Sequence, residues 1–436
     1  MSLQTEGLGA LSLGQRPIAF GTGLAHLRVT VESVILGLLP GPSSMDEPSL
    51  HRLRIVARAN TLFARLRRAG CERDAAGNRR LLYSHYASLV LLSLFNPAMQ
   101  SLRGLQSASE LRRVQKKLGT GRASLGSLSE SCRVFDPELL VPLIQELLAD
   151  LPASHPGPGP RRAIPDSIPH DLARRLVAAD GSALAALPHI VRAAAGGGPW
   201  KLHLQFRPLD GRPAELRIER EYDVHELDVL AEALAPDTVY LADRGYARYA
   251  LFNRIVAVGS DYVIRGQDRP AAVVEERPLS SAAREARVTS DAVVRLNLTR
   301  TSAAAIDHPV RRIVIAKRER GRHRSDRTNA DEVILFTSLL DPPAEAIAAM
   351  YELRWSIELF FRFLKQVLGL KRLFSDKPEA AAIQVYCAVI ASLLLAQAVG
   401  GRVTMDAFRM LSFFLQGWAD EKELLACLSK LREREA

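Results

Sequence analysis

Four side chains in the last third of the chain could act together on a phosphate group. Tyr351, Arg354, Glu358 and Lys365 follow one another at offsets of 0, 3, 7 and 14 residues. In an α-helix these offsets fall within a stripe roughly 60° wide and about 21 Å long. A phenol, a guanidinium, a carboxylate and an ammonium in one row could follow a phosphate backbone past a metal ion. A salt-bridged helix surface is the ordinary alternative.

Two aspartates could complete a metal site with Glu358. Asp180 follows a short apolar run, and Asp243 follows the apolar run 238–242. We expect each aspartate at the end of a strand, immediately before a turn, where an open α/β sheet presents ligands. Carboxylate oxygens suit Mg²⁺ and Mn²⁺, and two such ions can cut a phosphodiester bond. Spacing alone does not establish this set, since the 48 acidic residues offer many triples.

Strands, a helix and another strand are predicted between the two aspartates. The runs 201–207 and 215–220 alternate like paired strands around a turn, and a helix at 226–234 leads into a strand at 238–242. The row of polar side chains requires a long helix, for which Asp341 is the expected N-cap, followed by two prolines. These elements indicate an α/β core.

The stretch from 260 to 340 has a different pattern. We expect strands at 262–265, 293–298, 310–316 and 332–337, separated by charged turns. The sequence therefore predicts a separate β-rich insertion over residues 260–340. Its densest basic run, Lys317 to Arg324, is expected to contact DNA phosphates.

The N-terminal part is predicted to be a loosely ordered leader, residues 1–48, followed by a helical domain, residues 49–151. Arginines interleave its apolar periodicity, which favours a DNA-binding domain, although a solvated basic helix face is the alternative. A Pro/Gly-rich linker follows at 151–165, and residues 403–436 form a C-terminal helical segment. The expected helices are His51–Ala69, Leu81–Leu94, Ser107–Lys117 and Pro137–Leu151.

Composition and charge narrow the class of partner. The formal net charge of +10 favours a polyanion, because each phosphate neutralised by Lys or Arg releases counterions. Four cysteines without a CxxC pair are interpreted as free thiols in a reducing compartment. The uncharged stretches 83–102 and 380–401 are interpreted as buried core helices. We therefore expect a cytoplasmic, nucleoid-associated protein with no membrane partner.

The helix pattern resembles a known signature. Tyr351, Arg354, Glu358 and Lys365 match the Y-x2-R-x3-E-x6-K pattern of the insertion-sequence-4 (IS4) family of transposases. Asp180-Gly181-Ser182 is similar to the first acidic motif of that family, and Asp243-Arg244-Gly245-Tyr246 to the second. The three motifs occur in the expected order, and the resemblance covers roughly residues 165–400.

This resemblance implies a ribonuclease-H-like catalytic core over residues 166–259 and 341–402. Asp180, Asp243 and Glu358 would be its DDE triad, binding two Mg²⁺ ions that Mn²⁺ can replace. Tyr351, Arg354 and Lys365 would contact DNA phosphates near the cleaved bond. The β-rich insertion of the family would fill the 115 positions between Asp243 and Glu358 (358 − 243), far more than a simple connection needs.

The implied function is cut-and-paste transposition. Metal-dependent cleavage at the terminal inverted repeats of the transposon would be followed by transfer into double-stranded target DNA, by a homodimer on paired ends. Some relatives stack a flipped base on a tryptophan of the insertion, but none occurs here between Asp243 and Asp341, and Trp355 lies within the signature helix. Two alternatives stay open: a catalytically silent DNA-binding protein of transposase descent, and a ribonuclease-H-like nuclease without strand transfer.

Overall fold

The computed structural model describes most of the chain from residue 55 onward. The predicted leader, most of the linker and residues 318–324 of the basic run lie outside the described residues. The described ranges are 55–66, 74, 77–118, 121–151, 165–184, 200–220, 225–267, 271–296, 305–317, 332–370, 373–375, 377–399, 403–415 and 418–435.

Within these ranges nine strands form one mixed sheet. Strand β1 pairs in parallel with β4, and β4 with β5, whereas every other pairing is antiparallel. In spatial order the strands are β3 (Arg212–Arg220), β2 (Trp200–Arg207), β1 (Leu176–Leu184), β4 (Val239–Ala242), β5 (Asp261–Arg265), β9 (Glu332–Thr337), β8 (Val310–Ala316), β7 (Val288–Leu296) and β6 (Ala271–Glu276).

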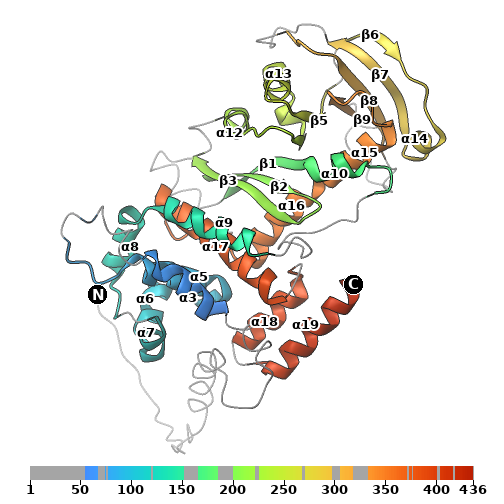
Figure 1. The fold of residues 1–436 in the computed structure, drawn as a ribbon. Coiled ribbons are helices and arrows are strands. Elements are labelled where there is room, and N and C mark those ends of the chain that lie inside the picture. Colours follow the sequence, from blue (N-terminus) through green and yellow to red (C-terminus); the bar gives the residue numbers. More distant parts are fainter. Residues whose placement is uncertain are drawn as a thin grey trace, which may run out of the picture.

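The β-rich region is not a separate sheet. Strand β5, which begins just after the predicted boundary at residue 260, pairs with β4 on one side and with β9 on the other. The sheet therefore runs without a break from the aspartate-bearing strands into the insertion (Figure 1). Strand β6 was not predicted, because five of its six residues are exposed and no buried face creates an alternating pattern.

Helices cover both faces of the central strands. One face packs on α12 (Glu226–Glu232) and α13 (Tyr249–Ala257), and the other on α15 (Ala344–Leu353), α16 (Trp355–Arg362) and α17 (Pro378–Val399). Because side chains alternate along a strand, Val177 and Ala179 face α12, whereas Ala178 faces α16. Cover on both faces explains the continuous apolar run before Asp180.

Helix α17 joins the N-terminal helices to the sheet. It packs against α3, α5, α8 and α9 and also against β3, and one continuous hydrophobic core includes all of these parts. The N-terminal helices are α3 (Ile55–Ala64), α5 (Tyr83–Phe95), η1 (Pro97–Met99), α6 (Leu102–Ser109), α7 (Arg112–Leu118), α8 (Leu125–Val134), η2 (Pro137–Leu140) and α9 (Val141–Ala149). The N-terminal region therefore does not have a core of its own.

Two arginines of the predicted basic face already have acidic partners. Arg58 pairs with Asp150 at 2.8 Å, and Arg65 pairs with Glu146. Arg112 and Lys116 of α7 are exposed. Arg52 and Arg54 lie outside the described residues. Arg58 of α3 and Arg65, the residue after α3, are therefore exposed side chains in ion pairs within the protein, and the choice between a DNA-binding face and a solvated basic face stays open.

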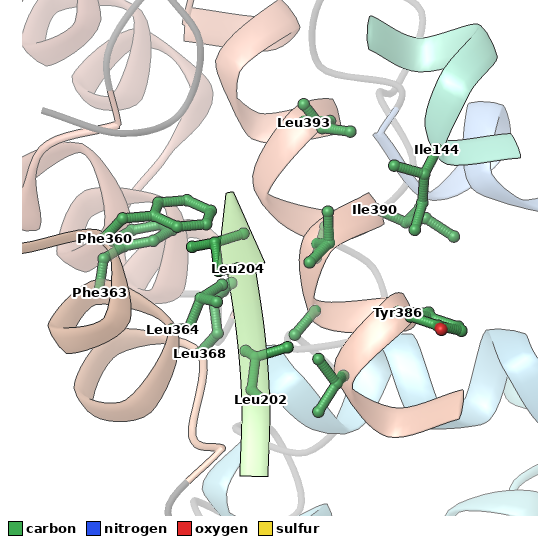
Figure 2. Packing of buried hydrophobic residues seen from close by; sticks show 14 of the residues in the cluster. Ile144, Leu202, Leu204, Phe360, Phe363, Leu364, Leu368, Tyr386, Ile390 and Leu393 are labelled. Carbon is green, nitrogen blue, oxygen red and sulfur yellow. The ribbon is translucent and has the colours of Figure 1, made fainter. Parts of the chain in front are cut away.

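The two apolar stretches form α5 and α17, and both are buried. Among the described residues α17 is long and apolar enough to cross a membrane, but 94% of the tested window, within Pro378–Gln397, is buried inside the protein. Figure 2 shows Leu202 and Leu204 of β2 between Phe360 and Leu364 on one side and Ile390 and Leu393 of α17 on the other. This is the packing of a core helix. Cys132 and Cys387 are buried free thiols.

The predicted long helix is interrupted twice. Helix α15 ends at Leu353, Arg354 separates it from α16, and a π-helix, η4 (Phe363–Val367), follows α16. Asp341 is not the N-cap as predicted, because the helix begins three residues later and Pro343 takes that position. The shorter elements α10 (His170–Arg175), η3 (Arg244–Tyr246), α14 (Ser281–Glu285), α18 (Met405–Leu415) and α19 (Glu421–Glu435) complete the described fold.

Candidate active site

The two aspartates lie at matching positions on neighbouring parallel strands. Ala179 of β1 is in register with Ala242 of β4, so the next residues are Asp180 within β1 and Asp243 directly after β4. Because side chains alternate along a strand, both aspartates lie on the face of the sheet that packs on α15 and α16, opposite to the face that packs on α12. The prediction that Asp180 ends its strand is wrong. Strand β1 continues to Leu184 because β2 is long enough to pair with it, and only β4 ends here.

Asp180 is partly buried beside other charges. The backbone N–H of Gly181 donates to its Oδ1 at 2.8 Å. Burial raises the pKa of Asp180 to about 6, and the nearby Glu226 and Glu358 add to the rise, whereas the hydrogen bond from Gly181 and the charge of Arg354 oppose it. A carboxylate with this environment is stabilised by a further cation.

Asp243 is contacted from both an adjacent strand and the helix. The Tyr351 hydroxyl lies 3.5 Å from Asp243 Oδ1, and a guanidinium nitrogen of Arg265 lies 3.7 Å from the same oxygen. Burial raises the pKa of Tyr351 to about 12, so the phenol stays protonated and can donate. Arg265 comes from β5 and was not predicted as part of the site.

Glu358 is paired with Arg354 along the same helical face. A guanidinium nitrogen of Arg354 donates to Glu358 Oε1 at 2.7 Å, and the Arg354 side chain is 11% exposed. The same guanidinium lies 5.6 Å from the centre of the Tyr351 ring. Arg354 therefore links the helical carboxylate to the phenol that contacts Asp243.

Lys365 reaches the strand that carries Asp180. Its ammonium donates to Ser182 Oγ at 2.7 Å. Burial lowers the pKa of Lys365, while the charge of Asp180 opposes that change. Lys365 lies within the π-helix η4, and the wider turn changes its direction relative to a regular α-helix. Of the four predicted helix residues, Tyr351 thus contacts Asp243 and Lys365 contacts Ser182, two residues after Asp180, whereas Arg354 and Glu358 bond to each other.

The donor set has the chemistry that a hard divalent cation requires. Asp180, Asp243 and Glu358 supply only oxygen ligands, and their strands and helix face one another. In the described part of the chain, however, no three His, Cys, Asp or Glu side chains lie close enough to hold a metal ion. Glu358 is bound to Arg354 instead, so metal binding would require this pair to separate.

One acidic residue near the aspartates was missed by the sequence analysis. Glu226, the first residue of α12, lines a cavity of about 430 Å³ together with Asp180, His203 and Tyr246. Lys201 of β2 forms an ion pair with its Oε1. Acidic residues are common in the first turn of a helix because their charge interacts favourably with the helix dipole. No sequence signal therefore distinguished Glu226.

A second cavity, of about 720 Å³, lies between α15 and α16 and the predicted β-rich region. Tyr351, Arg354 and Trp355 line it from the helices, and Arg287 and Lys317 line it from the β-rich region. Trp355 is 42% exposed. Lys317, the one residue of the predicted basic run within the described ranges, therefore lines the same cavity as Arg354.

The part of the chain that contains these residues is similar to known proteins. A family model described as transposase DDE domain matches residues 173–394, just over half of the chain. The protein y4zB of Sinorhizobium fredii, named as a transposase, is 28% identical over 230 residues, which are 52% of this chain and 61% of that protein. A transposase for insertion sequence element IS421 of Escherichia coli is 25% identical over 249 residues, covering 51% of this chain and 65% of its own.

A transposase named for element IS5377 of Geobacillus stearothermophilus is 28% identical over 195 residues, covering 45% of this chain and 48% of its own. The chain thus spans between about half and two thirds of the length of these relatives. Asp180, Asp243 and Glu358 all lie within the matched residues 173–394.

Proposed function

Because this chain belongs to the transposase DDE domain family, we propose that it is a DNA transposase whose acidic triad is Asp180, Asp243 and Glu358. The observation that carries this proposal is the register of β1 and β4, which brings Asp180 and Asp243 side by side. Both aspartates face the helix that carries Glu358. The charges of Glu358 and Arg354 act on Asp180, which supports placing all three carboxylates in one centre.

The proposed catalytic core is ribonuclease-H-like and of the IS4 type. It comprises the five strands β1 to β5 with α12, α13 and α15 to α17, so its first part extends to residue 265 rather than 259. Strands β6 to β9 form the insertion, and the N-terminal helices with their exposed Arg112 and Lys116 form a DNA-binding region. These assignments place the insertion next to the signature helix, with the larger cavity between them.

Asp180, Asp243 and Glu358 would hold two Mg²⁺ or Mn²⁺ ions. Bound there, such ions neutralise phosphate charge and make a bound water more nucleophilic. The guanidinium of Arg354 then exchanges Glu358 for a phosphate oxygen, which its planar set of donors fits well. Lys365 and the protonated phenol of Tyr351 donate to neighbouring phosphates.

The proposed reaction has two displacements at phosphorus. A water oxygen first forms a bond to the phosphorus at a transposon end, and the bond to the 3′ oxygen breaks, leaving a 3′-hydroxyl. That hydroxyl then attacks a phosphorus of target DNA, and the bond to the leaving oxygen of the target breaks. The protein supplies position and charge neutralisation rather than a covalent intermediate. Two ends must be joined, so we expect a homodimer on paired ends in the cytoplasm.

The test is an assay that separates cutting from joining. Labelled DNA carrying the flanking ends of the element is incubated with the protein, a target plasmid and Mg²⁺ or EDTA. The proposal predicts nicked ends and labelled plasmid in Mg²⁺ only. Cutting without labelled plasmid would favour the nuclease alternative, and specific binding without cutting would favour the silent DNA-binding protein.

A further inference from the structure

We propose that Glu226 is a positioning residue of the catalytic centre, acting from the far face of the sheet on both strand segments that carry the metal-binding aspartates. This inference rests on the proposed function, since it assigns Glu226 to the same metal-dependent site. It is distinct from the triad, because Glu226 belongs to α12 rather than to the face covered by α15 and α16. Glu226 lies outside the three motifs used in the sequence analysis.

Each aspartate is followed by a glycine that Glu226 approaches. A Cβ atom placed on Gly181 would lie 2.7 Å from Glu226 Oε1, well inside van der Waals contact. A Cβ atom on Gly245 would lie 3.9 Å from Glu226 Oε2. The two oxygens of one carboxylate therefore reach the segments just after Asp180 and Asp243, and a side chain at position 181 would displace the ends of Glu226 and Lys201.

Lys201 holds the Glu226 carboxylate in this place. Lys201 stands opposite Ala183 in the β1–β2 ladder, so it projects to the same face as Gly181. Its ammonium pairs with Glu226 Oε1, and the two side chains are 18% and 28% exposed. A Cβ atom on Gly181 would also lie 2.9 Å from Lys201 Cε. The ion pair therefore covers the peptide between Asp180 and Gly181.

This ion pair can act on Asp180 through its neighbour in the chain. It restrains the Gly181 peptide, whose N–H donates to Asp180 Oδ1 at 2.8 Å. Residues behind metal ligands orient those ligands, and their loss commonly weakens metal affinity by about 10- to 100-fold.

The first test measures Mn²⁺ binding to the full chain by titration calorimetry, with no DNA present. Glu226→Gln should weaken Mn²⁺ binding roughly 10-fold. Glu232→Gln is the matched control, because Glu232 lies on the same helix and lines the same cavity but pairs with Arg217. It should stay within about twofold of the wild type, and melting curves establish that each variant is folded.

The second test is a double-mutant cycle with Gly181→Ala. The added methyl group should weaken Mn²⁺ binding in the wild type, where it collides with the paired ends of Glu226 and Lys201. In a Glu226→Ala background Lys201 loses its partner and can move, so the same change should cost much less, giving a non-additive pair. A general loss of stability would be additive, so additive effects would overturn the proposal.

The outcomes also separate this proposal from the proposed function. Unchanged Mn²⁺ binding in Glu226→Gln, with binding lost in Glu358→Gln, would refute the role of Glu226 and leave the triad intact. Absence of Mn²⁺ binding to the wild type, together with absence of DNA cutting, would refute both proposals.

Discussion

Two helical stretches of similar length pack on the same face of the sheet, yet they differ in regularity. Helix α17 runs for 22 residues without a break, and its residues from Ala380 to Ala396 are buried. The stretch from α15 through η4 covers a comparable length but is divided at Arg354 and ends in a π-helix. The first contributes to the core, and the second presents charged side chains to the strands.

The difference shows that polar side chains in a partly buried helix need hydrogen-bond partners. In α17 the polar side chains are few, and Ser392 satisfies its hydroxyl on the carbonyl of Val389 within the helix. In the signature helix Arg354 and Lys365 must meet partners on the same helix and on β1. The helix departs from regular α-helical geometry at Arg354 and at Lys365, and π-helical segments of the kind that contains Lys365 occur frequently at functional sites.

The largest expected effect on stability comes from a change in α17, and this change should leave DNA cleavage unaffected. Ile390, which is fully buried, should matter for stability alone, and Ile390→Ala should lower the free energy of unfolding by about 2–5 kcal/mol. Urea denaturation measures this loss. The cleavage rate per folded molecule should stay near the wild-type value at a temperature where the variant is folded. A large rate loss in folded Ile390→Ala would contradict the division of roles.

A change at Arg354, between α15 and α16, should lower the cleavage rate and leave stability nearly unchanged. Arg354→Lys keeps the charge but loses the planar guanidinium that pairs with Glu358 and lies over Tyr351. We expect the cleavage rate to fall about 10- to 100-fold with little change in melting temperature. Arg362→Lys is the control, because Arg362 is exposed on the same helix. Equal rates in the two variants would show that the geometry of Arg354 is unimportant.

The smallest expected effect is on melting temperature, and it comes from the free energy needed to keep the Asp180 carboxylate ionised in the folded protein. Its folded pKa of about 6 is above the unfolded value of roughly 3.9, so the folded state binds more protons between these values. Stability contributed by Asp180 is therefore lost as pH rises from about 4 to 6. In EDTA at pH 7.5, Asp180→Asn should melt about 1–3 °C above the wild type, and at pH 4 the two should coincide. A lower melting temperature for the variant at pH 7.5 would refute this.

Much of the local structure could be predicted from periodicity. The alternation of 201–207 and 215–220 predicted the antiparallel β2–β3 pair, and the uncharged run 380–401 predicted a buried helix. The interruption at Arg354 could not be predicted, because the residues on both sides have helical spacing. Likewise, strand β6 has no buried face, and the sharing of one sheet by core and insertion depends on long-range pairing.

The motifs predicted the residues of the candidate site but not its geometry. The assignment of Asp180, Asp243 and Glu358 to one acidic triad stays a prediction, and the register that aligns the two aspartates exists only once β1 and β4 pair. Arg265 lies beside Asp243 and Glu226 lies beside Gly181, and each pair joins elements distant in the chain. Neither residue belongs to the three motifs used in the sequence analysis, so only the folded structure brings them to the site.

The most direct measurement compares wild type with Glu358→Gln on DNA carrying the ends of the element, in Mg²⁺ and in Mn²⁺. The amide keeps the shape of the side chain and removes the charge that a metal ion needs. The wild type should cut, and the variant should cut on the order of a thousand-fold more slowly while still binding the ends. If both proteins cut at the same rate, Glu358 is not a metal ligand and the assignment of the triad is wrong.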